Sequence, residues 1–241
     1  MKRFEHLLKG HKSLVFLDFE GTQYSHEMIA LGAVICIIDK KGHIKKEKKA
    51  LKLYVKAKNK IGKFVINLTG ITEDTLQKKG ISFKQAMLEL KKYCGINFKK
   101  SSFITFGNHD MRILNMSIAH NLDIDTDICH QIQKNYIDFS AFIADYVKDD
   151  KNNPLSLVNY CKLFDVKEAG QAHDPAIDAI NLAHLYDAFI RNKDLVLEQY
   201  LKVMGKSTHL PEPIAKAVKK LSNGEDVTAK EFIEHTKEYL D

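Results

Sequence analysis

The sequence lacks the features of membrane, secreted and zinc-binding proteins. No apolar run approaches the roughly 20 residues that a membrane-spanning helix needs, and the segment from Met1 to His6 does not lead into a signal-peptide core. The four cysteines are widely scattered without a Cys-x-x-Cys pair, which argues against a disulfide scaffold and a structural zinc site. No internal repeat is present. We therefore predict a cytoplasmic protein with no membrane partner.

Acidic residues are scarce in one segment of a chain whose formal net charge is +6. Between Lys40 and Lys63 the lysines are dense and Glu47 is the only acid. Such a segment suits a polyanion, and nucleic acid is the commonest one. The same pattern is typical of a solvated edge strand that its charges protect from aggregation. The sequence leaves both interpretations open.

The length of 241 residues and the hydrophobic content of 44% are sufficient for one substantial core with an appendage. Strands are predicted at 14–20 and 29–38, and a turn at Asp39–Gly42 leads into a third predicted strand near 43–56. These three strands are predicted to pair antiparallel at the beginning of the fold. Strands followed by alternating strands and helices predict a mixed α/β fold. The later elements are predicted as a strand at 102–106 and helices at 83–94, 110–120, 137–147, 155–164 and 175–190.

The pattern changes near Asn192 to helical segments broken by Pro211-Glu212-Pro213 and Asn223-Gly224. Thr228 and Glu231 have the spacing of a capping box. The sequence therefore predicts a main domain over 10–192 and a helical extension over 193–241.

Asp18-Phe19-Glu20 closes the apolar run at 14–17. Asp18 and Glu20 share a face, because side chains at i and i+2 of a strand point the same way. Desolvation and mutual repulsion of two carboxylates there cost roughly several kcal/mol unless a cation neutralises them. The pair therefore indicates a metal site. A strand end whose acids simply reach water is the alternative.

Two later segments carry further acids. Asp110 follows the strand at 102–106, at the carboxyl end where open α/β sheets bind ligands; a helix cap is its alternative role. Pro175 suits a first helical position, so Asp178 falls in the first turn and His173 lies in the preceding loop, free to approach a substrate. A surface histidine before a capped helix is the alternative there.

Taken in order, these motifs resemble the DEDDh family of 3′–5′ exonucleases, which includes polymerase proofreading subunits, ribonuclease T and oligoribonuclease. The resemblance covers about residues 12–192, and the segments 68–72 and 109–112 look most similar to the exoribonucleases related to the enhanced-RNAi enzymes. It implies a ribonuclease H-like mixed β-sheet flanked by helices, with a C-terminal helical appendage. The matching pieces are Asp18-Phe19-Glu20, Gly107-Asn108-His109-Asp110, and His173 with Asp178 five residues later.

The resemblance implies a metal-dependent exonuclease that acts on single-stranded RNA or DNA with a free 3′ end, RNA being favoured, and that releases nucleoside 5′-monophosphates. Oxygen ligands suit two Mg²⁺ or Mn²⁺ ions, with Asp18 as the predicted bridge. Glu20, Asp110 and Asp178 are implied as the other ligands. His173 is implied as the general base, the usual role of an imidazole at neutral pH.

The resemblance also implies contacts with the terminal nucleotide. They are expected from the backbone after Asp18 and from the turn near residue 70. Core packing is the alternative role for the side chains of Leu68 and Ile71 in that turn. Asn108 is a candidate for a phosphate contact, with a turn former as the alternative. The residues concerned are Phe19, Gly21, Thr22, Leu68, Gly70, Ile71 and Asn108.

Two other classes of function remain open. A non-catalytic nucleic-acid-binding module on the same fold would typically have lost one acid or the histidine. An all-helical HD-type phosphohydrolase would use the His-Asp dipeptides at 109–110 and 173–174, but it leaves the strands at 14–38 unexplained. Departures from the family pattern at Gly21-Thr22 and Pro175 affect the positioning of the 3′ end and remove no acid.

Overall fold

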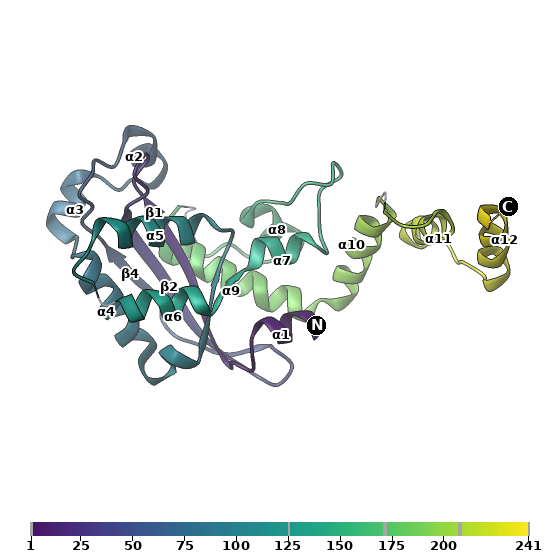
Figure 1. Cartoon of the computed structure of the whole chain (residues 1–241), viewed down its shortest axis with the longest axis horizontal. Coiled ribbons are helices and arrows are strands. Elements are labelled where there is room, and N and C mark those ends of the chain that lie inside the picture. Colours follow the sequence, from purple (N-terminus) through teal and green to yellow (C-terminus); the bar gives the residue numbers. More distant parts are fainter. Residues whose placement is uncertain (1, 125, 171–172, 207–208, 241) are drawn as a thin grey trace. The chain divides into compact units, whose positions relative to one another are not determined.

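A mixed β-sheet organises the first part of the chain in the computed structural model, which describes residues 2–124, 126–170, 173–206 and 209–240 (Figure 1). Along the sheet the strand order is β3-β2-β1-β5-β6, and β4 pairs with β2 beside β3. β1 is antiparallel to β2 and parallel to β5, which is parallel to β6. The strands are β1 (Ser13–Gly21), β2 (Met28–Ile38), β3 (Ile44–Glu47), β4 (Leu51–Tyr54), β5 (Ser101–Thr105) and β6 (Tyr136–Asp138).

Helices precede and follow the strands along the chain, and those that pack with the sheet lie on both of its faces. The described helices before the last strand are α1 (Lys2–Leu7), α2 (Lys63–Thr69), α3 (Glu73–Lys79), α4 (Phe83–Cys94), the 3₁₀ helix η1 (Gly95–Lys100), α5 (His109–His120) and α6 (Thr126–Lys134). Those after it are α7 (Phe139–Ala144), α8 (Leu157–Leu163), α9 (Pro175–Arg191), α10 (Lys193–Gly205), α11 (Glu212–Ser222) and α12 (Ala229–Leu240).

The alternation of β1 decides which helices each side chain meets. Val15, Leu17 and Phe19 join a buried cluster with α4, α5 and α6, while Phe16 points to the other face, where its ring packs 5.5 Å from that of Tyr186 on α9. Figure 1 shows α5 and α6 in front of the sheet and α9 behind it. Asp18 and Glu20 therefore share the face that α9 covers.

The fold prediction of a mixed sheet flanked by helices is confirmed, and a six-stranded sheet contradicts the all-helical HD-type alternative. Two element predictions are wrong. The strand predicted near 43–56 is two short strands, β3 and β4, that pair with different parts of β2. The helix predicted at 137–147 begins as strand β6, because Tyr136–Asp138 pairs with β5 before α7 starts at Phe139.

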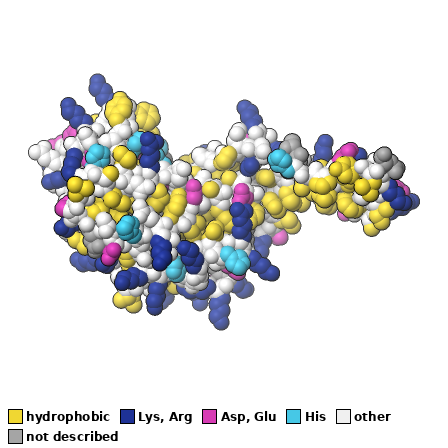
Figure 2. Space-filling view, viewed as in Figure 1, with side chains coloured by type: hydrophobic (Ala, Val, Ile, Leu, Met, Phe, Trp, Pro, Cys, Tyr) yellow, Lys and Arg dark blue, Asp and Glu magenta, His cyan; other side chains and the backbone are white. Residues whose placement is uncertain are grey.

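By its internal contacts the chain forms two compact units, Met1–Phe139 with Leu157–Arg191, and Ser140–Ser156 with Asn192–Asp241. In the second unit, Tyr146 packs against Tyr200 of α10 with ring centroids 5.2 Å apart, and Lys220 of α11 forms an ion pair with Glu231 of α12. The Thr228 hydroxyl accepts a hydrogen bond from the Glu231 N–H, as the predicted capping box requires. Apolar side chains are prominent on this unit in Figure 2.

Among the described residues, every helix is too short or too polar to span a bilayer.

Candidate functional site

A cavity of about 390 Å³ opens in the first unit at the carboxyl end of β1. All four predicted acids and the predicted histidine line it. They come from three distant segments, namely β1, the start of α5, and the loop and first turn of α9. The cavity is lined by Asp18, Phe19, Glu20, Gly21, Thr22, Gln23, His26, Phe64, Val65, Leu68, Phe106, His109, Asp110, His173 and Asp178.

Asp110 reaches the cavity from the opposite side of the sheet. It lies in the first turn of α5 and its side chain is only 6% exposed. Its Oδ1 accepts a 2.7 Å hydrogen bond from the N–H of Phe19, the residue between the two acids of β1. This bond ties the start of α5 to the end of β1 and places the three carboxylates close together.

The loop before α5 is held by the neighbouring strands. Thr105 and Tyr136 both donate hydrogen bonds to the carbonyl oxygen of Gly107, at 2.6 and 2.9 Å, and the Gly107 N–H donates to Asp138 at 3.1 Å. Gly107 has φ of 103°, a value that favours glycine. The turn therefore aims the start of α5 at the cavity.

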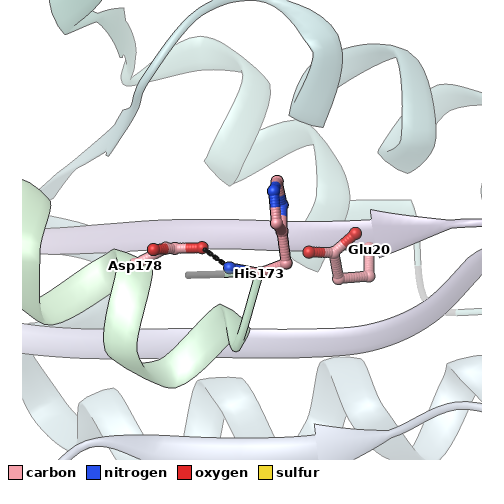
Figure 3. Close-up of side chains that lie close together, drawn as sticks. All are labelled: Glu20, His173 and Asp178. Atoms are coloured by element: carbon pink, nitrogen blue, oxygen red, sulfur yellow. Dashed lines mark hydrogen bonds between the residues drawn. The ribbon is translucent and has the colours of Figure 1, made fainter. Parts of the chain in front are cut away.

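The third acid-bearing segment begins at Asp174, whose carboxylate accepts from the Ala176 N–H at 3.1 Å and caps α9. Asp174 also forms a 2.7 Å ion pair with Lys52 of β4. Asp178 accepts a 2.8 Å hydrogen bond from the His173 N–H, shown dashed in Figure 3. His173 has φ of 64°, so this bond stabilises a left-handed loop conformation that costs energy in a non-glycine residue.

Glu20, His173 and Asp178 approach one another closely enough to share a cation. One potential ligand atom from each lies within 4.8 Å of the others. Figure 3 shows the imidazole between the two carboxylates, with the Glu20 side chain directed toward it from β1. The imidazole is exposed, so it is accessible to a substrate and its water.

A glycine allows α9 to approach the sheet at this point. Gly32 of β2 pairs with Asp18, and a Cβ at Gly32 would lie 1.9 Å from the carbonyl oxygen of Pro175, the first residue of α9. Any side chain would push the helix away. Gly32 therefore determines how close the first turn of α9, with Asp178, comes to the acids of β1.

The carboxylates destabilise one another's charged forms. Burial raises the pKa of Asp18 well above its usual range, and the charges of Asp110, Glu20 and Asp178 raise it further. The pKa of Glu20 rises to about 8, first through burial and then through Asp178 and Asp110. Burial raises the pKa of Asp110 to about 7, although the hydrogen bond from Phe19 opposes it.

The pKa of Asp178 is also raised, chiefly by burial and against the hydrogen bond from His173. Four carboxylates that resist ionisation together are stabilised by a bound cation, because its charge offsets both burial and repulsion. Oxygen donors with one imidazole nearby suit a hard divalent ion such as Mg²⁺ or Mn²⁺. The donor set therefore fits the predicted metal.

The predicted substrate contacts divide into two groups. Phe19, Gly21, Thr22 and Leu68 line the cavity. Ile71 does not, since it is 4% exposed and packs in a cluster with Ile29, Ile61 and other apolar side chains.

Gly70 and Asn108 lie outside the cavity lining as well, and each stands at a helix end. Gly70 ends α2 with φ of 70°, and Asn108 precedes the first residue of α5. Burial of the Ile71 side chain agrees with the alternative of core packing for that side chain. The phosphate contact of Asn108, whose side chain is exposed and makes no cap hydrogen bond, stays a prediction, as does the backbone contact of the turn near residue 70.

Sequence reasoning missed part of the cavity wall, which comes from the loop after β1 and from α2. The loop is closed by hydrogen bonds between the Thr22 N–H and the Glu27 carbonyl at 2.8 Å, and between the Gln23 N–H and the Ile61 carbonyl at 2.8 Å. Neither element carries a motif. The structure alone marks this wall, through the 64% exposure of the aromatic residue Phe64. The missed residues are Gln23, His26, Phe64 and Val65 of these two elements, and Phe106 and His109 beside the turn before α5.

Glu27 anchors this wall. This residue is only 2% exposed. Its carboxylate accepts hydrogen bonds from the backbone N–H groups of Lys58 and Asn59 and from the side-chain amide of Asn59, at 2.7 to 3.1 Å. Burial alone would raise its pKa, but these hydrogen bonds outweigh burial and lower it. The charged carboxylate therefore fixes the segment that leads into α2.

A family model described as exonuclease matches residues 15–186. The chain belongs to the exonuclease family. The prediction of a DEDDh-type exonuclease is thereby confirmed at the level of the family. Its closer likeness to the enhanced-RNAi branch stays a prediction. No curated protein matches this exonuclease.

Solved structures share the fold of this exonuclease at low sequence identity. The nuclease domain of 3'hExo, a DEDDh family member bound to rAMP, is 20% identical with a TM-score of 0.58, covering 77% of this chain and 93% of that one. E. coli Exonuclease I with a dT13 oligonucleotide is 17% identical with a TM-score of 0.57, covering 79% and 43%. S. pombe Pop2p in its Mg²⁺- and Mn²⁺-bound form is 16% identical with a TM-score of 0.53, covering 80% and 87%.

Proposed function

We propose that this exonuclease removes nucleotides from the 3′ end of single-stranded nucleic acid, RNA in preference to DNA, and releases nucleoside 5′-monophosphates. One observation carries the proposal: a single cavity gathers Asp18, Glu20, Asp110 and Asp178 with His173 beside them. The match to the family model, and the shared fold with nucleases described with rAMP and with a dT13 oligonucleotide, support it. A non-catalytic binding module would not need to retain all five residues.

The carboxylates would hold two divalent cations, with Asp18 between Glu20 on its own strand and Asp110 across the sheet. When bound, such ions neutralise phosphodiester oxygens and lower the pKa of a water ligand. His173 would accept the proton of the attacking water on a ring nitrogen. Its exposed position beside Glu20 and Asp178 supports this role.

The cavity wall supports cleavage at a chain end. A volume of about 390 Å³ is at the low end of the roughly 300–1,000 Å³ range of ligand pockets, and it suits one nucleotide better than a continuous strand. Phe64 and Leu68 of α2 form an apolar side to this cavity. The exposed ring of Phe64 can stack on a base, as aromatic side chains do in single-strand binding.

The preference for RNA rests on the motif resemblance alone. The structural neighbours include a 3′-exonuclease described with a histone mRNA stem-loop and an exonuclease with DNA oligonucleotides. A contact with the 2′-hydroxyl is what would separate the two substrates.

The experiment compares matched RNA and DNA strands labelled at the 5′ end, incubated with the full chain and Mn²⁺ or Mg²⁺. We expect ladders that shorten from the 3′ end, faster for RNA, and complete inhibition by EDTA. A strand blocked with a 3′-phosphate is the matched control and should be degraded more slowly. Absence of any ladder from protein with confirmed bound metal would contradict the proposed function, and equal rates would contradict only the preference for RNA.

A further inference from the structure

The end of the sheet opposite the cavity is densely basic. β1, β5 and β6 run parallel, so the segments that lead into them meet at one edge. β2 is antiparallel and ends at the same edge, where β3 pairs with its last residues. Lysines occupy each of these segments. We name them the amino-end lysines: Lys9, Lys12, Lys40, Lys41, Lys45, Lys46, Lys99, Lys100 and Lys134.

Direct contacts join these segments into one surface. The Ile38 N–H donates to the carbonyl oxygen of Lys12 at 2.9 Å, and Ser13 is paired with Ser101, the residue after Lys100. The Lys9 ammonium donates to the carbonyl oxygen of Lys134 at 3.0 Å. Figure 2 shows Lys and Arg side chains along the lower edge of the first unit.

Two hollows are part of this surface. One, of about 620 Å³, is lined by Lys12, Lys40, Lys41 and Lys45 together with Asp39 and His43. The other, of about 360 Å³, lies between η1 and α6 and is lined by Lys91, Lys99, Lys134, His130 and Asp127, with Gln131 and two apolar residues. Both hollows are open to a ligand that follows the edge of the sheet.

The amino-end lysines are not neutralised by the protein. All nine are exposed, and within the ranges that the structure describes none forms an ion pair with a carboxylate. Two acids lie in the hollows, and the Asp39 carboxylate already accepts from the N–H groups of Lys41 and His43. By contrast, Lys78, Lys84, Lys202 and Lys216 each have a carboxylate within 4.0 Å.

The size of this surface suits a strand of nucleic acid. Five strands spaced about 4.8 Å apart give an edge roughly 20 Å wide, which matches several phosphates at about 3.4 Å per phosphate along one strand of a duplex. From Ser13 to Asp18, β1 is about 17 Å long. A substrate whose 3′ end lies in the cavity must therefore extend well beyond one nucleotide to reach the amino-end lysines.

We propose that the amino-end lysines form a second nucleic-acid site, which binds the phosphates of the substrate strand on the 5′ side of the end being removed. This rests on the proposed function, because the exonuclease acts on a polyanion whose uncleaved part must leave the cavity. Recognition is through charge alone and is independent of base sequence. Long strands then bind more tightly than short ones, and the added affinity falls with salt.

The test is a fourfold variant, Lys12→Gln, Lys45→Gln, Lys100→Gln and Lys134→Gln. The matched control is Lys78→Gln, Lys84→Gln, Lys202→Gln and Lys216→Gln, which removes the same charge from ion-paired lysines. Fluorescence anisotropy in EDTA measures binding of 5′-labelled strands of 4 and 30 nucleotides across a salt series. Without metal the strands stay intact, so binding is measured apart from chemistry.

For the 30-nucleotide strand, the slope of log affinity against log salt should fall by about 3 in the test variant, since each phosphate contact contributes about 0.7–0.9. It should be unchanged in the control. With metal, both variants should degrade the 4-nucleotide strand at the wild-type rate. The KM of the 30-nucleotide strand should rise in the test variant alone, with kcat retained.

Equal slopes in the test variant and the control would overturn the second site, while wild-type turnover of the short strand would leave the proposed function intact. Binding that depends on the lysines in a wild-type protein that degrades neither strand would instead support the site and remove the proposed function. Stronger competition by anionic lipid vesicles than by unlabelled strands would overturn the assignment to nucleic acid.

Discussion

The two ends of β1 place opposite charges in opposite environments. At the carboxyl end, Asp18 and Glu20 are partly buried and meet two further acids, so burial and repulsion raise their pKa values. At the amino end, the lysines are exposed, and each keeps its charge in water at little cost. The acids therefore need a bound cation before all of them can be ionised together, whereas the exposed ammonium groups of the lysines can bind an anion directly.

The largest expected effect comes from removing a charge at the carboxyl end. Loss of a residue that only supports a metal ligand typically reduces activity about 10–100-fold. Asp18→Asn should reduce the rate of hydrolysis by more than this, because Asp18 lies between other carboxylates and is the proposed shared metal ligand. Binding of a long strand in EDTA should persist through the amino end. Rates on a labelled oligonucleotide and anisotropy measure the two properties.

Asp74→Asn is the control for this variant, since Asp74 is an exposed acid of α3 paired with Lys78. It should retain full activity. Wild-type turnover by Asp18→Asn would contradict the metal-binding role of the acids at the carboxyl end of β1. Loss of the circular dichroism spectrum of the folded protein would show that the carboxylate is needed for folding.

His173→Ala should lower kcat by about 10²–10⁴-fold, the usual contribution of a general base, and change KM little. Steady-state kinetics on a short strand measures both constants. His184→Ala is the matched control, because His184 is a partly exposed histidine of α9 whose partner is Glu47, outside the cavity. Equal changes in kcat and KM would instead indicate a binding role for His173.

Gly32→Ala should destabilise the protein by about 1–3 kcal/mol, the usual cost of overpacking, because its Cβ would meet the Pro175 carbonyl oxygen. It should also weaken Mn²⁺ binding by moving Asp178 away from Asp18. Urea unfolding and calorimetric titration measure these effects. Unchanged Mn²⁺ affinity in a destabilised variant would show that Gly32 matters for packing alone.

The raised pKa values also make stability depend on pH. In EDTA, Glu20 and Asp110 have pKa values of about 8 and about 7, above those of the unfolded chain, so the folded state binds more protons between about pH 4.5 and 8. The unfolding free energy should therefore decrease as pH rises through this window. Saturating Mg²⁺ should cancel the decrease, and melting temperatures across the pH series test it. A Tm in EDTA that is constant over this window would contradict the repulsion among these acids.

Much of the fold could be predicted because its signals are local. β1 contains the apolar run at 14–17, β2 is almost entirely apolar, and α9 begins at Pro175 as expected. Thr72 caps α3 by accepting from the Thr75 N–H. The failures have a physical reason as well. Tyr136–Asp138 is strand because β5 offers it hydrogen bonds, a partner that no local pattern reveals.

The candidate site shows the same limit. The acids were found from motifs in three segments, and the structure brings them together, but the wall from α2 has no motif. The side chain of Ile71, a candidate substrate contact, is buried in the core. The lysine-rich segment also divides in space: Lys40 to Lys46 lie at the amino end, while Lys52 pairs with Asp174 beside the acids.

The sequence by itself determined most of the strands and helices and which residue types can carry chemistry, because periodicity, caps and side-chain chemistry are properties of neighbouring residues. Only the tertiary structure decided which distant groups meet. Parallel pairing of β1 with β5 directs Asp110 to Asp18, and Gly32 admits α9 with Asp178. The same pairing collects lysines from separate segments at the opposite edge, since parallel strands all begin at one side of a sheet.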